Sequence, residues 1–202
     1  MIKDCLNNYN HALELIKEDD VVLDLGANIG GFSHLASKKA RKVYAIEAEP
    51  NCYEVLKENC PEVTILNSAV VKDDYTDSYV IFEVNKSKNS SCSGHTVIDK
   101  KPKPSRLNFK VEALKFTNIV ESIRPRVLKI DIEGGEYGIL DEEIPSWIKV
   151  ITGELHGMNK EDNKKMYQVV NKLKADGWEF LFEEVEKIFG KESLINFTCI
   201  RD

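Results

Sequence analysis

The stretch that most constrains this chain is residues 21–33, which read Val-Val-Leu-Asp-Leu-Gly-Ala-Asn-Ile-Gly-Gly-Phe-Ser. The apolar run at positions 21–23 predicts a buried strand, and Gly26, Gly30 and Gly31 predict a tight turn that leads into a helix. Glycine has no Cβ, so such a turn lets the backbone approach a ligand closely. The helix that follows presents free amides and its positive dipole end to that ligand. The sequence therefore predicts a nucleotide-type site in a β-α-β unit.

The side chains of this turn favour S-adenosylmethionine over a dinucleotide. A dinucleotide-binding turn carries a glycine at its middle position to admit a pyrophosphate, and Asn28 occupies that position here. Asp24 adds a carboxylate before the first glycine, and a carboxylate suits the amino group of an amino acid better than a phosphate. A nicotinamide oxidoreductase is therefore disfavoured. The residues assigned to cofactor binding in this stretch are Asp24, Gly26, Asn28, Gly30, Phe32 and Ser33.

Further cofactor contacts are predicted beyond the next two strands. Glu47 follows the predicted strand 43–46, and an acid at that place in a nucleotide-binding fold accepts hydrogen bonds from the ribose hydroxyls. Glu49 is the alternative ribose ligand, because a one-residue shift changes which side chain faces the site. The other residues assigned to the cofactor are Asn51 and, beyond a third strand at 63–66, Ser68 and Ala69, whose backbone is expected to meet the adenine edge.

A charged run at residues 126–140 contains the predicted catalytic residues. The predicted strand 127–132 includes Lys129 and Asp131, and charges within an apolar strand are costly unless they are paired or functional. Asp131 lies at the carboxyl end of this strand, where parallel sheets bind ligands. Glu133 follows it directly. We assign Asp131 to both catalysis and cofactor binding.

The neighbouring predicted strand, 147–155, ends in Glu154-Leu155-His156. Strand alternation puts Glu154 and His156 on one side of the chain, so both are expected to converge with Asp131. Three roles remain open for this group. One is a general base, for which His156 has the most suitable ordinary pKa. Another is a divalent-metal site that acidifies a hydroxyl, and the third is a structural or orienting role. The catalytic residues assigned are Lys129, Asp131, Glu133 and His156, and no metal ligand is predicted.

The remaining features describe the chain as a whole. Its 202 residues are expected to form a single domain, with a helical lead-in over residues 1–19. The polar composition of residues 85–105 predicts an active-site loop. A helix is expected over residues 160–176, and the last two strands are expected to form an antiparallel pair. No apolar run is long enough to span a bilayer, so no membrane contact is expected.

Charge and cysteine usage narrow the partners. The formal net charge of -6 disfavours broad binding to nucleic acid. The start of the chain lacks the apolar segment of a signal peptide. The five cysteines form no CxxC pair and are odd in number, so we expect reduced thiols and a cytoplasmic location.

Taken together, these motifs resemble FkbM-type class I S-adenosylmethionine-dependent methyltransferases. The resemblance covers roughly residues 20–200, and its specific part is the Lys-Ile-Asp-Ile-Glu-Gly-Gly-Glu run at 129–136. The resemblance also rests on residues 24–30, 47–50, 67–69 and 154–156. The resemblance implies an α/β, Rossmann-like methyltransferase fold. That fold has a seven-stranded, mostly parallel sheet with the last strand antiparallel and helices on both faces.

The resemblance also implies O-methylation of a hydroxyl on a small molecule or glycan, with S-adenosylmethionine as methyl donor and S-adenosylhomocysteine as product. Two other interpretations stay open. One is an RNA methyltransferase that acts on ribose or base, which the acidic composition disfavours. The other is a non-catalytic S-adenosylmethionine-binding subunit, which the intact run around Asp131 disfavours.

Overall fold

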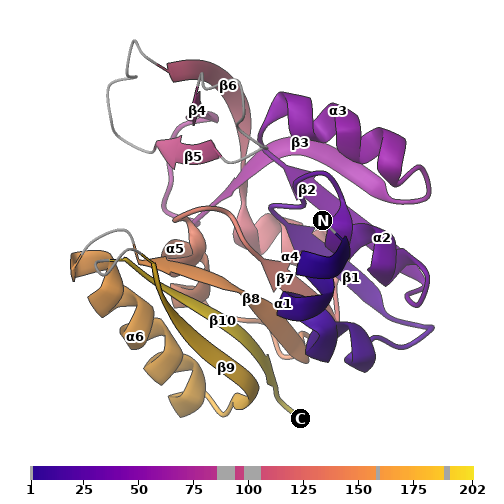
Figure 1. The fold of residues 1–202 in the computed structure, drawn as a ribbon, viewed down its shortest axis with the longest axis vertical. Coiled ribbons are helices and arrows are strands. Elements are labelled where there is room, and N and C mark those ends of the chain that lie inside the picture. The colour runs from indigo at the N-terminus through magenta and orange to yellow at the C-terminus, as the bar shows by residue number, and fades with distance from the viewer. Residues whose placement is uncertain (1, 86–93, 98–105, 158–159, 189–191) are drawn as a thin grey trace.

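The computed structural model describes residues 2–85, 94–97, 106–157, 160–188 and 192–202, which form one mixed sheet flanked by helices (Figure 1). The helices are α1 Ile2–Leu15, α2 Gly31–Ser37, α3 Pro50–Asn59, α4 Phe116–Ile123, α5 Glu136–Asp141 and α6 Lys160–Ala175. The strands are β1 Val21–Leu25, β2 Lys42–Glu47, β3 Thr64–Val71, β4 Tyr79–Asn85, β5 Gly94–Val97, β6 Arg106–Lys115, β7 Val127–Ile130, β8 Val150–Gly157, β9 Glu179–Ile188 and β10 Glu192–Ile200.

Across the described residues the strand order is β5-β4-β6-β3-β2-β1-β7-β8-β10-β9. Within this order, the five adjacent strands β3, β2, β1, β7 and β8 pair in parallel. β10 runs antiparallel to both β8 and β9. This part confirms the predicted mostly parallel sheet with an antiparallel last strand. The sheet has ten strands rather than seven because β6, β4 and β5 extend it beyond β3.

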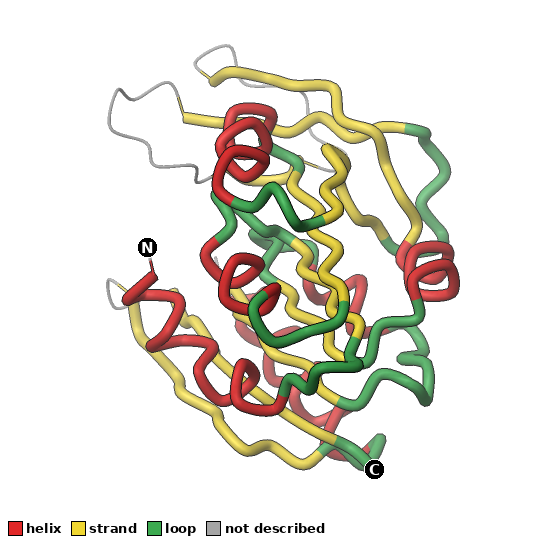
Figure 2. The backbone as a smooth tube through the Cα atoms, turned by 90° about the vertical axis from the view of Figure 1, so that its right-hand side faces the viewer, coloured by secondary structure: helices red, strands yellow, loops and turns green. Residues whose placement is uncertain are grey.

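The two faces of the sheet bury different helices, as the alternation of side chains along a strand requires. In β1, Val22 belongs to a core cluster shared with α1, α2 and α3. Leu23 and Leu25 point the other way, into the cluster that α4, α5 and α6 cover. Figure 2 shows helices on both sides of the sheet. The apolar run at the start of the glycine motif is therefore a central strand that is buried on both faces.

β3 runs further than its sequence suggested, and this shapes the site. The strand was expected at 63–66 and extends to Val71. It pairs with β2 as far as Asn67 and with β6 from Ser68 onward. At the change of partner, the Asn67 side-chain amide donates to the backbone carbonyl of Glu47 at 2.8 Å. The sheet opens there, and the second half of β3 faces the space beyond the end of β2.

Two other expectations need correction. The stretch 85–105, predicted as a loop, contains strand β5 at Gly94–Val97, which pairs with β4; residues 86–93 and 98–105 lie outside the described residues. Cys52 is disulfide-bonded, whereas Cys60 and Cys199 are buried free thiols. Spacing along the chain does not reveal which cysteines meet in the fold. The expectation of reduced thiols is therefore wrong at Cys52.

Among the described helices, none combines the length and apolarity needed to cross a bilayer.

Gly26→Ala is expected to destabilise the protein more than Gly177→Ala. Both glycines have positive φ, +73° and +86°, so alanine adds strain of about 1–2 kcal/mol at either position. A Cβ on Gly26 would lie 1.8 Å from the carbonyl oxygen of Asp131, whereas one on Gly177 meets nothing within 4 Å. The clash adds about 1–3 kcal/mol for Gly26 alone. Urea unfolding of both variants measures the difference, and equal losses would contradict this close packing of the loop on β7.

Candidate active site

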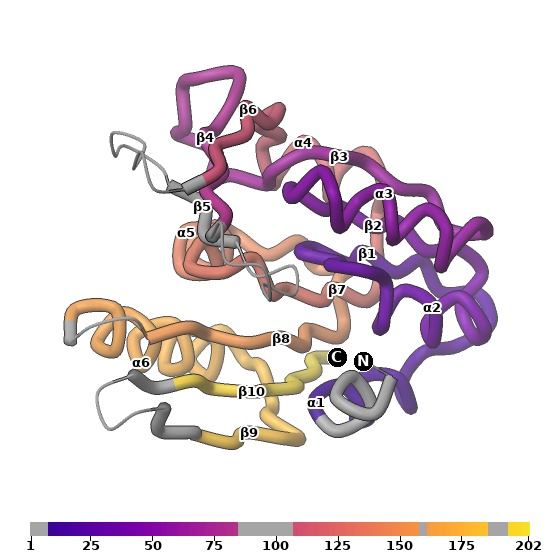
Figure 3. The backbone as a smooth tube through the Cα atoms, turned by 45° about the horizontal axis from the view of Figure 1, so that its top comes forward, coloured from indigo at the N-terminus to yellow at the C-terminus, as the bar shows by residue number. Residues whose placement is uncertain are grey.

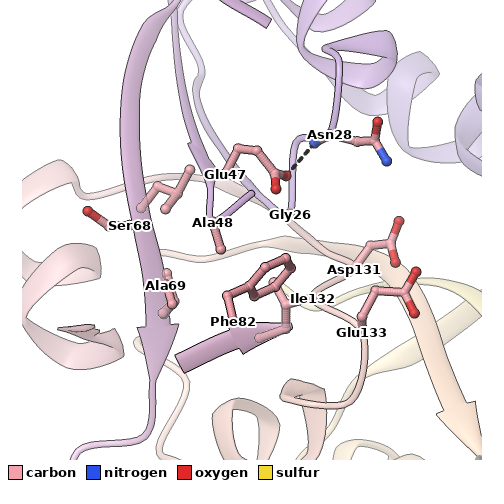
Figure 4. Close-up of a pocket in the computed structure, with 12 residues that line it drawn as sticks. Gly26, Asn28, Glu47, Ala48, Ser68, Ala69, Phe82, Asp131, Ile132 and Glu133 are labelled. Carbon is pink, nitrogen blue, oxygen red and sulfur yellow. Dashed lines mark hydrogen bonds between the residues drawn. The ribbon is translucent and has the colours of Figure 1, made fainter. Parts of the chain in front are cut away.

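A cleft opens at the carboxyl ends of β1, β2, β3 and β7, the edge at which parallel sheets bind ligands (Figure 4). The enclosed part of the cleft has a volume of about 60 Å³, and the rest of the space between its walls is open to solvent. Figure 4 shows Ser68 and Ala69 at one end and the carboxylates of Asp131 and Glu133 at the other. The lining residues are Gly26, Asn28, Ile46, Glu47, Ala48, Ser68, Ala69, Val70, Phe82, Asp131, Ile132 and Glu133.

The glycine loop folds back over the end of β2. The amides of Gly26 and Ala27 both donate to the carbonyl oxygen of Ile46, at 2.9 and 3.1 Å. Asn28 follows with φ +53°, a left-handed conformation that asparagine tolerates better than most residues. This conformation aims the Asn28 amide at Glu47 Oε2, 2.7 Å away. The loop therefore positions a backbone donor and a carboxylate side by side in the cleft.

Glu47 and Glu49 have different roles in the structure. Glu47 lines the cleft, and its other oxygen accepts the amide of Glu49 at 2.8 Å. Burial raises the pKa of Glu47, although these two amides and the charge of Lys129 oppose the shift. Glu49 instead caps α3, where it accepts from the Cys52 amide and from the side chain of Asn51. Glu49 and the exposed Asn51 thus lie outside the cleft lining.

Asp24 lies behind the loop rather than in the cleft. Its side chain is fully buried; Oδ2 accepts the Ser33 hydroxyl at 2.6 Å, and Oδ1 lies 3.2 Å from Lys129 Nζ. Lys129 also donates to the carbonyl oxygen of Gly26 at 2.7 Å. Phe32 is buried in the core. In the structure Asp24 therefore fixes the glycine loop from behind.

One end of the cleft is apolar. Ala69 of β3, Phe82 of β4 and Ile132 beyond β7 line this end, whereas the hydroxyl of Ser68 points away from Phe82, toward Glu112 of β6 (Figure 4). Phe82 had not been assigned to the site. Its signal was the alternation of β4, in which Val80, Phe82 and Val84 are all buried. This end of the cleft has the chemistry to hold a flat, apolar ring.

The other end carries acidic groups around His156. The ring atom Nε2 lies 3.7 Å from Glu154 Oε2, 3.8 Å from Glu133 Oε2 and 3.9 Å from Asp131 Oδ1. The ring atom Nδ1 lies 3.0 Å from Glu136 Oε1. Residues from two neighbouring strand ends thus converge as the sequence predicted. Their catalytic roles remain predictions.

The charge states of this group follow from its surroundings. Burial would lower the pKa of His156, but the hydrogen bond to Glu136 and the nearby carboxylates outweigh it and raise the pKa to about 10. Burial raises the pKa of Glu133 to about 7. The pKa of Lys129 is raised despite its burial, because Asp24 and Asp131 lie close. Lys129 and His156 both hold a proton at neutral pH in this environment, and neither is then ready to accept another.

Helix α1 contributes two site residues that sequence reasoning missed. The Tyr9 hydroxyl lies 3.1 Å from Asp131 Oδ2 and 3.2 Å from Glu154 Oε1, and the Asn8 amide donates to Glu154 Oε1 at 2.8 Å. Figure 3 shows α1 beside β10, and the helix also contacts β8. The available signal was Tyr9 itself, because a tyrosine on the buried face of a helix needs a partner for its hydroxyl.

The comparisons with known proteins agree with this geometry. Residues 24–192 match the model of the methyltransferase FkbM domain. A hexuronic acid methyltransferase of Haloferax volcanii is 30% identical over 63% of this chain and 52% of its own length. An uncharacterized protein of Methanocaldococcus jannaschii is 42% identical over 33% of this chain and 26% of its own length. The chain thus spans about half or less of these relatives.

The comparison with solved structures concerns the fold. An rRNA methylase from Streptococcus thermophilus superposes with a TM-score of 0.53 at 9% identity, covering 96% of this chain and 94% of that one. At this identity the likeness establishes the class I methyltransferase fold and nothing further. The FkbM model, by contrast, covers most of the chain and includes every cleft-lining residue. The chain therefore belongs to the FkbM methyltransferase family.

Proposed function

We propose that the cleft binds S-adenosylmethionine and that the protein transfers its methyl group to a hydroxyl of a small molecule or glycan. The observation that carries this proposal is the joint position of Asn28 and Glu47. A backbone loop and a buried carboxylate meet there, between an apolar end and an acidic end of one cleft. S-adenosylmethionine has matching parts: a flat base, a ribose with two hydroxyls, and a cationic sulfonium with an amino acid.

Each part of the cofactor is assigned to the group that complements it. Glu47 accepts hydrogen bonds from the ribose hydroxyls. The base lies at the apolar end, against Ala69, Phe82 and Ile132. The sulfonium and the amino acid lie toward Asn28 and Asp131, where carboxylates favour positive charge. Asp24 acts from behind the loop, through its contacts with Lys129 and Ser33.

The reaction is an in-line displacement. The acceptor oxygen forms a bond to the methyl carbon while the carbon–sulfur bond breaks, and its electron pair returns to sulfur to give neutral S-adenosylhomocysteine. The hydroxyl proton passes to the carboxylate of Glu133 or to water. Holding the two reactants in line supplies most of the rate, since orientation can contribute about 7–11 kcal/mol.

The acidic end of the cleft limits the acceptor. Asp131, Glu133 and Glu154 repel phosphates, which favours a hydroxyl on a neutral molecule or on a glycan over nucleic acid. RNA remains the competing class of acceptor because structural neighbours of this fold include an rRNA methylase. A direct assay separates these classes.

The first experiment incubates the full chain with S-adenosylmethionine and a panel of monosaccharides, uronic acids, glycolipids and RNA. S-adenosylhomocysteine release and the mass of the acceptor are measured together. Methylation of a carbohydrate hydroxyl supports the proposal. Methylation of RNA alone, or cofactor binding with no turnover on any acceptor, would overturn the small-molecule assignment.

Asp131→Asn is expected to lower turnover by about 100-fold or more, because it removes a charge beside the reacting groups. The fold is expected to persist, since the amide keeps the size of the side chain. The exposed Asp77→Asn is the matched control and should retain full activity. Initial rates on the best acceptor, with circular dichroism of each variant, measure this. Near-normal turnover by Asp131→Asn would remove Asp131 from the reacting centre.

The affinity for S-adenosylhomocysteine is expected to depend on pH through Glu47. Burial raises the pKa of this carboxyl above its usual 4.5, so acid converts it to the neutral form earlier than an exposed glutamate. Affinity is then full above the raised pKa and falls as the pH drops through it. Hydrogen bonds to a charged acceptor contribute about 1.5–3 kcal/mol each, so the expected loss is tenfold or more.

Calorimetric titration across pH measures this effect, with Glu47→Gln as the control. The variant should bind weakly at every pH, because glutamine does not ionise. A wild-type profile parallel to that of Glu47→Gln would show that another group causes the pH dependence.

A further inference from the structure

We propose that Asp131, Glu154 and His156 bind one divalent cation at the acidic end of the cleft. The sequence left such a cation as an alternative to a general base, and the geometry favours it. Binding of the cation stands on the geometry alone, whereas its use in methyl transfer rests on the proposed function.

The spacing fits ligands around a common centre. One atom from each of the three residues lies within 4.8 Å of the others. His156 Nε2 is 3.7 Å from Glu154 Oε2 and 3.9 Å from Asp131 Oδ1, too far for hydrogen bonds. Ligand atoms about 2.1 Å from a cation lie roughly 3.0–3.5 Å apart. The side chains need to move inward by only a few tenths of an ångström.

His156 is oriented as a metal ligand. Its Nδ1 is held by Glu136, a fully buried carboxylate that also accepts the amides of Ile132 and Gly134 at 3.1 and 2.8 Å. A carboxylate in that position fixes the ring with Nε2 facing the other ligands, where the cation takes the place of the Nε2 proton. Glu136 is thus a positioning residue for His156.

The two carboxylate ligands are anchored in the same way. Asp131 Oδ2 and Glu154 Oε1 both accept from the Tyr9 hydroxyl, and Glu154 Oε1 also accepts from Asn8. The remaining oxygens, Oδ1 and Oε2, are the ones that face His156. Each ligand therefore has one polar atom held by the protein and a second directed at the shared centre.

The excess of negative charge at this end of the cleft favours a bound cation. Four carboxylates surround the imidazole: Asp131, Glu133, Glu136 and Glu154. Lys129 is engaged with Asp24 at 3.2 Å and is 3.6 Å from Asp131. A proton on His156 supplies one positive charge to this half-buried group, and a divalent ion supplies two.

The mixed ligand set selects the kind of ion. Carboxylates suit Mg²⁺, Mn²⁺ and Ca²⁺, whereas imidazole favours transition metals. Mn²⁺ accepts both, and it is the probe that we would use first. Three protein ligands leave open positions on an octahedral ion. A bound ion would make an acceptor hydroxyl at such a position more acidic, and Glu133 or water would accept its proton.

Calorimetric titration of chelator-treated protein with MnCl₂ tests the site, with Glu154→Gln, His156→Asn and Glu136→Gln as variants. We expect one Mn²⁺ per chain in the wild type and at least tenfold weaker binding in the two ligand variants. Glu136→Gln removes the carboxylate that positions the His156 ring, and it should weaken Mn²⁺ binding about 10- to 100-fold. The exposed Asp77→Asn should bind as the wild type does.

The possible outcomes separate the proposals. The metal site is overturned if the folded wild type does not bind Mn²⁺, or if Glu154→Gln and His156→Asn bind it as tightly as the wild type does. His156 is then left as a protonated imidazolium. S-adenosylhomocysteine titrations on the same samples report the cofactor site independently. Cofactor binding and turnover without Mn²⁺ binding would refute the metal site alone. Mn²⁺ binding without methyl transfer to any acceptor would refute the proposed function alone.

Discussion

The buried contacts of Lys129 are the interaction on which the site depends. Its ammonium group lies 3.2 Å from Asp24 of β1 and 3.6 Å from Asp131 beyond β7, and it donates to the carbonyl oxygen of Gly26. One cation thus ties together two neighbouring strand ends and the loop between the sheet and α2. Loss of one partner in a buried ion pair costs about 3–5 kcal/mol, because the remaining charge is left uncompensated. The cleft exists where it does because these charges fix its floor.

The opening of the sheet after Asn67 forms the other side of the cleft. β3 leaves β2 after Asn67 and continues alongside β6, which carries Ser68 and Ala69 away from the glycine loop. The extra strand β4 then brings Phe82 over the gap. An apolar end and an acidic end therefore occur in one cleft, formed by different strands of one sheet. The asymmetry matches a ligand with an aromatic base at one end and a positive charge at the other.

Local patterns in the sequence predicted much of this arrangement. The apolar run before Gly26, the acid at Glu47 and the charged strand end at Asp131 each report a strand that ends at the same edge of a parallel sheet. What local patterns do not report is contact between distant segments. The side chain of Asp24 was expected in the cleft and faces Lys129 instead, because strand alternation and the position of β7 decide its direction. The Tyr9 hydroxyl, for example, depends on partners more than a hundred residues away in the chain.

The contribution of α1 has a consequence for how the protein matures. Tyr9 and Asn8 are made before their partners Asp131 and Glu154, which come more than a hundred residues later in the chain. Contacts between such distant segments form slowly, because closing a long loop costs entropy before it is rewarded. On the ribosome, the helix must wait without these partners until β7 and β8 have emerged. The acidic end of the cleft is therefore completed late, when α1 packs beside β8 and the hydroxyl of Tyr9 reaches Asp131 and Glu154.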